Sequence, residues 1–217
     1  MKNLTVILLV FISALAFTQT NLEISMVTEI NELRSNPKSF IPHVEVYIKF
    51  NNNFIERINS GKMKIKSTSG SVTKSNKTSN SKTISGKDVI LERIKAAKEL
   101  IIILNSITPL DTLAFNYDMY TITKGHAEYL YNTNKISHYD SNGNRASDRF
   151  KLFNLNVSEN LVSVGTFTKD DPIPLILSLL VDAGIQNRGH RKNLLNNNIR
   201  FISVSVVGGV CVQNFAN

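Results

Sequence analysis

The 217-residue sequence has a single cysteine, Cys211. One cysteine excludes an intramolecular disulfide, although small secreted domains often depend on such bonds. A chain of about 200 residues is large enough to form a hydrophobic core without them. We therefore expect one domain held together by packing. A lone cysteine in a strand is more often a buried, apolar residue than a nucleophile, and we interpret Cys211 in that way.

Acidic residues are missing from one part of the chain. The net charge is +8, and residues 60–87 contain seven lysines but no Asp or Glu, so the remainder is nearly balanced. This segment also lacks the arginines and aromatic side chains that stack on nucleic-acid bases. Because it is rich in Ser, Thr, Asn and Gly, the segment cannot bury enough apolar surface to offset the entropy cost of folding. We expect a flexible insert within the domain and no nucleic-acid partner.

Long hydrophobic runs are also scarce, and the one that stands out lies at the start of the chain. Lys2, the apolar run 4–12 and the small residues 13–16 follow the order of a secretory signal peptide. The run is shorter than the roughly 20 residues of a membrane span. We therefore predict a signal peptide over residues 1–16, with cleavage by residue 20 at the latest, and a secreted protein that is not integral to a membrane. Sequons at Asn76 and Asn156 then predict a glycoprotein.

Hydrophobic periodicity predicts helices early in the chain and a hairpin at its end. Apolar residues at helical spacing favour helices over 25–36, 88–105, 116–131 and 175–181, the first two capped by Ser25 and Asp88. Residues 40–54 suggest a short irregular or helical connection. Segments 201–207 and 210–215 resemble strands joined by the two-residue turn Gly208-Gly209. The class is therefore mixed α and β.

Two of the four histidines are candidates for chemistry. We interpret His43 as an exposed loop residue and His126, which shares a helix face with apolar residues, as part of the core. His138 and His190 lie in polar stretches, and Glu159 lies between them in sequence. Two imidazoles and a carboxylate can bind zinc in an open site or act as general acid and base. No contiguous metal-binding motif decides between these alternatives.

Several short motifs, taken in order, resemble the CAP superfamily, whose members carry an SCP domain. This group includes cysteine-rich secretory proteins, antigen 5 and pathogenesis-related proteins, and the missing disulfides place the chain near its bacterial and protist branch. The resemblance covers residues 25–216, interrupted by the insert. It is carried by the opening helix 30–37, His126-Ala127, Ser137-His138, Asp148-Arg149-Phe150, Glu159-Asn160, the signature-like RGHRKNLL at 188–195, and the closing segment 211–216.

The resemblance implies a single-domain α+β fold, an α-β-α sandwich with an antiparallel sheet, and a cleft with two histidines and two acids. Three of these match His138, Glu159 and His190. The second acid falls at Ala183 here, with Asp182 beside it as a further candidate. This implies a divalent cation such as Zn²⁺ in the cleft, and some family members also bind sterols or other lipids on separate surfaces.

Three functions therefore stay open. The first is a secreted binding module with a metal-holding cleft and a lipid, sterol or protein ligand. The second is a secreted hydrolase, such as a peptidase, in which Glu159 and His190 are catalytic. The third is a recognition protein with a vestigial cleft, whose lysine-rich insert and sequon are read by partners.

Overall fold

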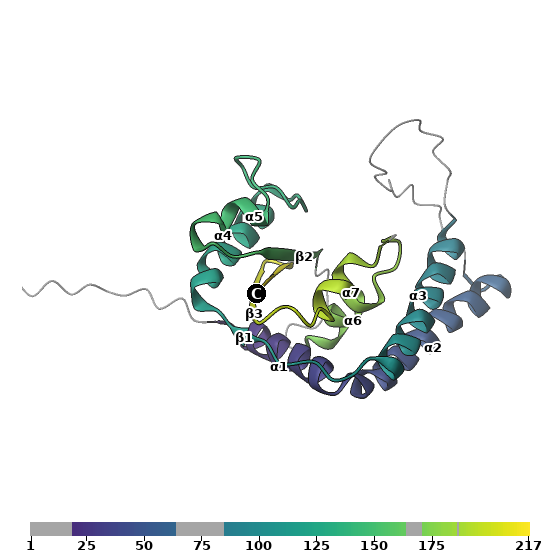
Figure 1. Ribbon diagram of the computed structural model, residues 1–217. Helices are drawn as coiled ribbons and strands as arrows, with labels where there is room; N and C mark the ends of the chain where they lie inside the picture. Colours follow the sequence, from purple (N-terminus) through teal and green to yellow (C-terminus); the bar gives the residue numbers. More distant parts are fainter. Residues whose placement is uncertain (1–18, 64–84, 164–170, 186) are drawn as a thin grey trace, which may run out of the picture.

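A computed structural model describes residues 19–63, 85–163, 171–185 and 187–217 (Figure 1). The predicted signal peptide, the sequon at Asn76 and most of the lysine-rich insert lie outside these residues. No helix within the described ranges is both long enough and apolar enough to cross a bilayer.

The sheet has four strands in the order β1-β3-β4-β2. They are β1 (Ala114–Phe115), β2 (Val157–Ser163), β3 (Phe201–Val207) and β4 (Val210–Ala216). The closing hairpin is confirmed, because β3 and β4 pair antiparallel across the predicted glycine turn. Both glycines adopt positive φ, and a side chain at Gly208 would collide with the ring of Tyr131.

The predicted antiparallel sheet is present in β2, β4 and β3, and the short edge strand β1 adds a parallel pairing with β3. Side chains of the first helix hold the segment that leads into β1. Asn31 exchanges two hydrogen bonds with the backbone of Leu113, and Arg34 Nε donates to the carbonyl of Asp111. These hydrogen bonds hold the segment beside β3, so that β1 pairs with β3 in the parallel direction.

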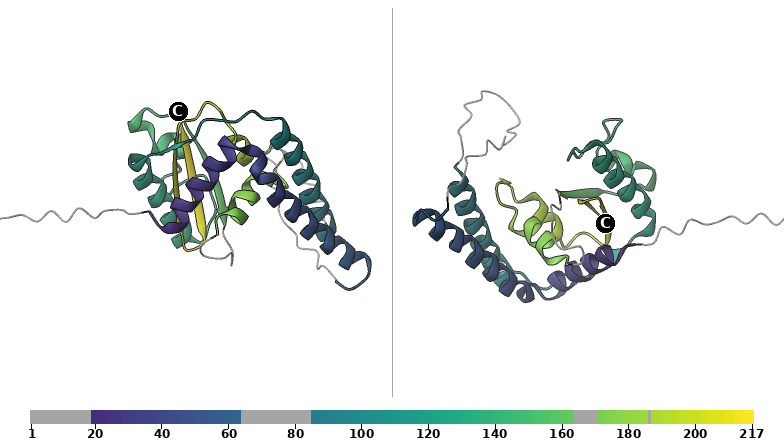
Figure 2. Two further views of the ribbon diagram at one scale, coloured as in Figure 1. Left: turned by 90° about the horizontal axis from the view of Figure 1, so that it is seen from below. Right: turned by 180° about the vertical axis from the view of Figure 1, so that it is seen from behind.

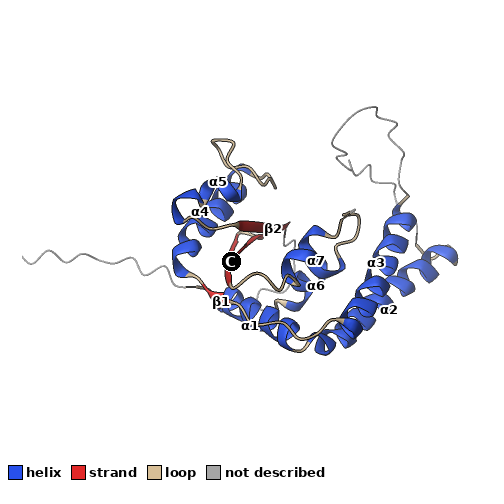
Figure 3. Ribbon diagram, in the orientation of Figure 1, coloured by secondary structure: helices blue, strands red, loops and turns tan. Residues whose placement is uncertain are grey.

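Helices cover both faces of the sheet, which confirms the α+β class (Figure 3). Helix α4 (Tyr117–Thr133) packs on one face, while α1 (Asn21–Ser35) and α6 (Ile173–Val181) pack on the other. Side chains alternate between the faces along each strand. Ile202 and Val204 of β3 therefore enter the main core with Met26 of α1, whereas Ser203 between them meets Thr123 of α4. Cys211 is fully buried in the same main core.

The connection expected at 40–54 is instead a 19-residue helix, α2 (Ile41–Asn59). It lies beside α3 (Gly86–Ser106), and the two form an arm at one side of the molecule (Figure 2). Apolar residues on the exposed side of α2, such as Val46 and Phe50, obscure its helical pattern in the sequence. Pro42 fits in the first turn, where its missing N–H has no helical partner to lose.

Both predicted N-cap residues, Ser25 and Asp88, are wrong by a few residues. α1 begins earlier, because Thr20 and Glu23 form a capping box ahead of Ser25. α3 is capped by the Ser85 side chain, which accepts from the Asp88 backbone N–H, so Asp88 lies inside the first turn. The remaining elements are short: the 3-10 helices η1 (Pro37–Phe40) and η2 (Lys151–Phe153), and the helices α5 (Ala146–Arg149) and α7 (Gly189–Leu194).

Candidate functional site

Glu159 lies on the edge strand β2 and faces α4, with only 3% of its side chain exposed. Both of its carboxylate oxygens are engaged. Oε1 accepts from His138 Nδ1 at 2.9 Å, and Oε2 accepts from Asn214 Nδ2 at 3.1 Å. Oε2 also forms an ion pair with Arg149 Nη2. Asn214 reaches this position because the sheet register pairs it directly with Glu159.

These contacts keep Glu159 charged in the folded protein. Burial alone would raise the pKa of its carboxyl group. The hydrogen bond from His138, the charge of Arg149 and the hydrogen bond from Asn214 outweigh burial, and the net pKa is lowered. Glu159 is therefore a fixed anion whose oxygens already have donors. This geometry disfavours it as the base that activates water in a hydrolase, since such a base must reach its proton donor.

His138 lies in the loop between α4 and α5, and half of its side chain is exposed, at 51%. Because the carboxylate of Glu159 can only accept, Nδ1 of His138 carries the proton. No hydrogen bond within the described residues engages its Nε2. Arg149 holds this loop, because its Nη1 donates to the carbonyls of His138 and Asn144 at 3.1 and 3.0 Å.

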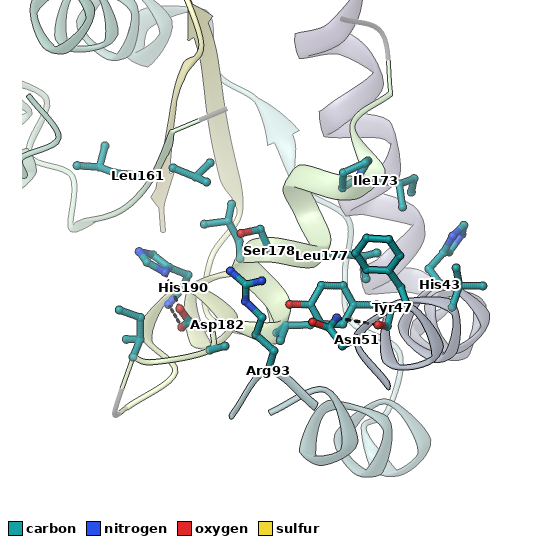
Figure 4. Close-up of a pocket in the computed structure, with 18 residues that line it drawn as sticks. His43, Tyr47, Asn51, Arg93, Leu161, Ile173, Leu177, Ser178, Asp182 and His190 are labelled. Atoms are coloured by element: carbon teal, nitrogen blue, oxygen red, sulfur yellow. Dashed lines mark hydrogen bonds and ion pairs between the residues drawn. The ribbon is translucent and has the colours of Figure 1, made fainter. Parts of the chain in front are cut away.

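His190 forms a second histidine–carboxylate pair, with Asp182 (Figure 4). Asp182 Oδ1 accepts from His190 Nδ1 at 2.8 Å, and Oδ2 accepts from the His190 backbone N–H at 2.9 Å. Asp182 ends α6 in the left-handed conformation, with φ of 51°. That conformation turns its buried side chain toward the start of α7. Asp182, the further candidate for the second acid, is thus the carboxylate that contacts His190, and no described residue bonds to Nε2 of His190.

The two pairs are connected through neighbouring residues of β2. Glu159 points to the α4 face and holds His138, whereas Asn160 points to the opposite face. Asn160 Nδ2 donates to the carbonyl of His190 at 3.3 Å, and Asn193 of α7 donates to Asn160 Oδ1 at 2.8 Å. Glu159 therefore holds the ring of His138, whereas Asn160 holds the backbone carbonyl of His190.

The other candidate residues behave largely as predicted. His126 is buried, its Nε2–H donates to the Ser137 carbonyl at 3.1 Å, and burial together with the charge of Arg149 lowers its pKa. Burial raises the pKa of the Cys211 thiol, which agrees with a core residue. His43 is exposed as expected, but on helix α2. Asn156 of the second sequon is also exposed.

The donor set available to a metal consists of the two imidazoles. Within the described ranges, no group of three or more His, Cys, Asp or Glu side chains is gathered as a metal site. The metal stays a prediction from the sequence. Each imidazole nevertheless has the arrangement common among metal ligands, with one ring nitrogen held by a carboxylate and the other unengaged. The chemistry of these residues fits a cation that takes the rest of its ligands from water.

Sequence reasoning missed two residues that build this site, Arg149 and Asn214. Arg149 lies in a motif that supported the family resemblance, yet His138 and Glu159, the site residues that it contacts, are 11 and 10 residues away in sequence. Asn214 meets Glu159 only through the pairing of β2 with β4. Strand order would have been needed to find it.

A cavity of about 700 Å³ opens beside His190. Its walls come from α2 and α3 on one side and from α6 and the end of β2 on the other (Figure 4). No sequence pattern predicted this cavity, because its two walls come from segments that lie far apart in the chain, with Arg93 on one side and Leu161 on the other.

Comparison with known proteins gives partial likenesses of structure. No protein-family model matches the sequence, and no curated protein is significantly similar to it. An extracellular SCP-domain protein from Bacillus anthracis matches with a TM-score of 0.41 and 22% identity, over 59% of this chain and 38% of that one. An outer surface protein from Borrelia burgdorferi matches with a TM-score of 0.41 and 19% identity, over 62% of this chain and 95% of that one.

A cysteine-rich secretory protein from Staphylococcus aureus matches with a TM-score of 0.36 and 16% identity, over 59% of this chain and 37% of that one. The chain thus spans well under half the length of the Bacillus and Staphylococcus proteins. Two of these three proteins are an SCP-domain protein and a cysteine-rich secretory protein, the group that the sequence resembles. Because all three TM-scores lie below 0.5, the matches do not assign the chain to that family, and membership is a proposal.

Proposed function

We propose that this chain is a secreted CAP-like binding module in which His138 and His190 hold a divalent cation such as Zn²⁺. The observation that carries the proposal is the paired geometry of these histidines. Each donates its Nδ1–H to a carboxylate whose side chain is at most 3% exposed. When the imidazole is neutral, this hydrogen bond leaves the lone pair of Nε2 available, and neutral imidazole is the form that binds metals.

In this proposal Glu159 and Asp182 position the ligands and do not themselves bind the metal. Carboxylates that accept from the far nitrogen of a ligating histidine fix its tautomer and orientation and raise its basicity. Glu159 has no free oxygen to offer, since Arg149 and Asn214 occupy Oε2. Water would complete the coordination shell, as in zinc sites that keep open positions. The cation would supply an electrophilic centre there.

Zinc titration of the purified, chelator-treated protein by calorimetry tests the proposal. We expect one zinc ion per chain, and binding that weakens as the pH falls through the histidine range. The His138→Ala, His190→Ala double variant should lose this binding. His43→Ala is the matched control, because His43 is exposed on α2 and bonds to no carboxylate among the described residues.

Variants of the two carboxylates separate positioning from ligation. Asp182→Asn and Glu159→Gln should weaken zinc binding about 10- to 100-fold without changing the stoichiometry. Unchanged affinity in the double histidine variant would overturn the proposal. Loss of binding in the His43→Ala control would show that zinc binds elsewhere on the chain.

The other predicted functions have weaker support. The buried, fully engaged Glu159 counts against a hydrolase, and a peptide-library digest that is identical for wild type and Glu159→Ala would trace any cleavage to a contaminant. A lipid or sterol ligand rests on the family resemblance alone. A recognition role for the lysine-rich insert concerns residues that lie mostly outside the described ranges.

A further inference from the structure

Arg188 lies just before His190 in the chain and connects this part of the site to helix α3 of the arm. Its Nη2 forms ion pairs with Glu92 at 2.8 Å and with Glu99 at 3.0 Å, and its Nε also donates to Glu99 at 3.3 Å. The two glutamates lie about two turns apart along α3, so they share one face of that helix. Only 16% of the Arg188 side chain is exposed. One guanidinium is therefore held by two carboxylates of α3.

The same guanidinium also binds the loop between α6 and α7. Its Nη1 donates to the carbonyl of Asp182 at 2.8 Å and to that of Ile185 at 3.3 Å. Asp182 is the residue whose carboxylate accepts from both the ring and the backbone N–H of His190. Arg188 thus joins α3 to the acid that orients His190.

The backbone of Arg188 depends on these side-chain contacts. Its φ of 49° lies in the left-handed region, which is costly for a residue with a long side chain. The other non-glycine residues with positive φ in the described ranges are Asn134, Asn154 and Asp182, whose short polar side chains tolerate this conformation. The ion pairs and hydrogen bonds of Arg188 offset the cost at its own position. The course of the chain into His190 therefore depends on them.

Arg191, on the other side of His190, also bonds to α3. Its Nη2 donates to the carbonyls of Ala96 at 2.9 Å and of Val181 at 2.8 Å. Ala96 lies between the two glutamates on their face of the helix. Arg191 is buried, whereas the side chains of the glutamates that bind Arg188 are 35% and 39% exposed. Dissolved ions can therefore weaken the contact of Arg188 but hardly that of Arg191.

We infer that Arg188 is a positioning residue for His190, and that its ion pairs with α3 make the zinc affinity of the site depend on the arm and on salt. This inference rests on the proposed function, because it concerns the residue that would bind the cation. Without the ion pairs, the loop that carries Asp182 opens more often. The apparent affinity for the metal falls with the fraction of molecules in which His190 is held ready to bind.

Zinc titration of the chelator-treated full chain by calorimetry tests the role of Arg188. Arg188→Gln should weaken zinc binding about tenfold, which is within the range that residues remote from a ligand reach, and should leave the stoichiometry unchanged. Arg188→Lys should restore part of the affinity, because it keeps the charge but not the paired donors of the guanidinium.

The Glu92→Gln, Glu99→Gln double variant tests the same contact from α3 and leaves the loop sequence intact. It should weaken zinc binding about as much as Arg188→Gln, and the two changes combined should have little further effect, since each removes the same ion pairs. Glu56→Gln is the matched control. Glu56 is exposed on α2, and its side chain forms no hydrogen bond or ion pair with another described residue.

Salt tests the ion pairs without a change of sequence. At about 1 M salt the Debye length falls to about 3 Å, and partly exposed ion pairs are screened. Zinc binding by the wild type should therefore weaken more between low and high salt than zinc binding by Arg188→Gln, in which no ion pair with α3 is left to screen.

Hydrogen exchange of the zinc-free protein separates positioning from general stability. The backbone N–H of His190 donates to Asp182, whereas Val212 lies in the central strand β4. Arg188→Gln should speed exchange at His190 about tenfold and leave Val212 unchanged, because opening of the loop does not require the sheet to unfold.

Equal zinc affinity and equal exchange at His190 in wild type and Arg188→Gln would overturn the inference. Equal acceleration at His190 and Val212 would overturn it as well, because it would indicate a loss of stability throughout the domain. A wild type that binds no zinc would instead overturn the proposed function, and exchange at His190 would still decide whether Arg188 positions that residue.

Discussion

Arg149 connects the loop that carries His138 to the carboxylate of Glu159. One nitrogen of its guanidinium forms the ion pair with Glu159 Oε2, and another donates to the His138 carbonyl at 3.1 Å. The Arg149 and Glu159 side chains are 7% and 3% exposed. A single buried arginine thus fixes both the histidine's backbone and the acid that orients its ring.

Replacing Arg149 should destabilise the protein strongly. Arg149→Ala leaves the charge of Glu159 buried without its cation, and removing one partner of a buried pair costs about 3–5 kcal/mol. We expect the free energy of unfolding, measured with urea, to fall by an amount of that order. Arg145→Ala is the control, because Arg145 is exposed and its contact with the Tyr139 hydroxyl should contribute less than about 1 kcal/mol. Equal losses in the two variants would contradict the buried pair.

His126 should make stability depend on pH. Burial, more than any other cause, lowers its pKa below the ordinary value of 6.5. Above that pH the imidazole is neutral in both states. As the pH falls below 6.5, the unfolded chain takes up a proton that the folded protein resists, so stability is lost toward the lowered pKa of the folded state.

Urea unfolding at pH 7 and pH 5 with EDTA measures this effect. His126→Gln keeps a donor for the Ser137 carbonyl but cannot titrate, so its stability should change less between these pH values than that of the wild type. His43→Gln, at an exposed position, should behave like the wild type. If His126→Gln and the wild type lose equal stability, the pKa of His126 is not responsible.

The Cys211 thiol should react only when the protein unfolds. It is fully buried, its sulfur lies 3.7 Å from Met26 Sδ, and its pKa is raised by burial. The reactive species is the thiolate, which both burial and the raised pKa suppress. We expect a maleimide or disulfide reagent to label the native protein at a negligible rate and to label one thiol per chain in denaturant. Rapid labelling of the native protein would place Cys211 at the surface.

Asn156 should carry a glycan when the chain passes through a eukaryotic secretory pathway. The residue is exposed just before β2, so an attached sugar would meet no core residue. Treatment with an amidase that removes N-linked glycans should lower the mass of the secreted protein, and Asn156→Gln should remove one glycan. An identical mass for Asn156→Gln and wild type would show that this sequon is not used.

Local patterns in the sequence predicted much of the fold. The spacing of apolar residues located α1, α3, α4 and α6, and Gly208-Gly209 located the closing hairpin, because these features depend on neighbours in the chain. Helix α2 was predicted only as a short irregular or helical connection. Its exposed apolar face lines a cavity, so the contrast between buried and exposed positions that identifies a surface helix is weak there.

The candidate site, too, was predicted only in part from the sequence. Residue chemistry and the family resemblance were sufficient to select His138, Glu159 and His190. Only the tertiary structure paired each histidine with its own carboxylate. Asp182 ends α6 in the left-handed conformation, which turns its side chain toward His190. Strand pairing brings Asn214 to Glu159. Composition likewise established that Cys211 has no disulfide partner within the chain. Its burial was also predicted from the sequence, but its place beside Met26 of α1 follows from the packing of β4 on that helix, which only the tertiary structure decided.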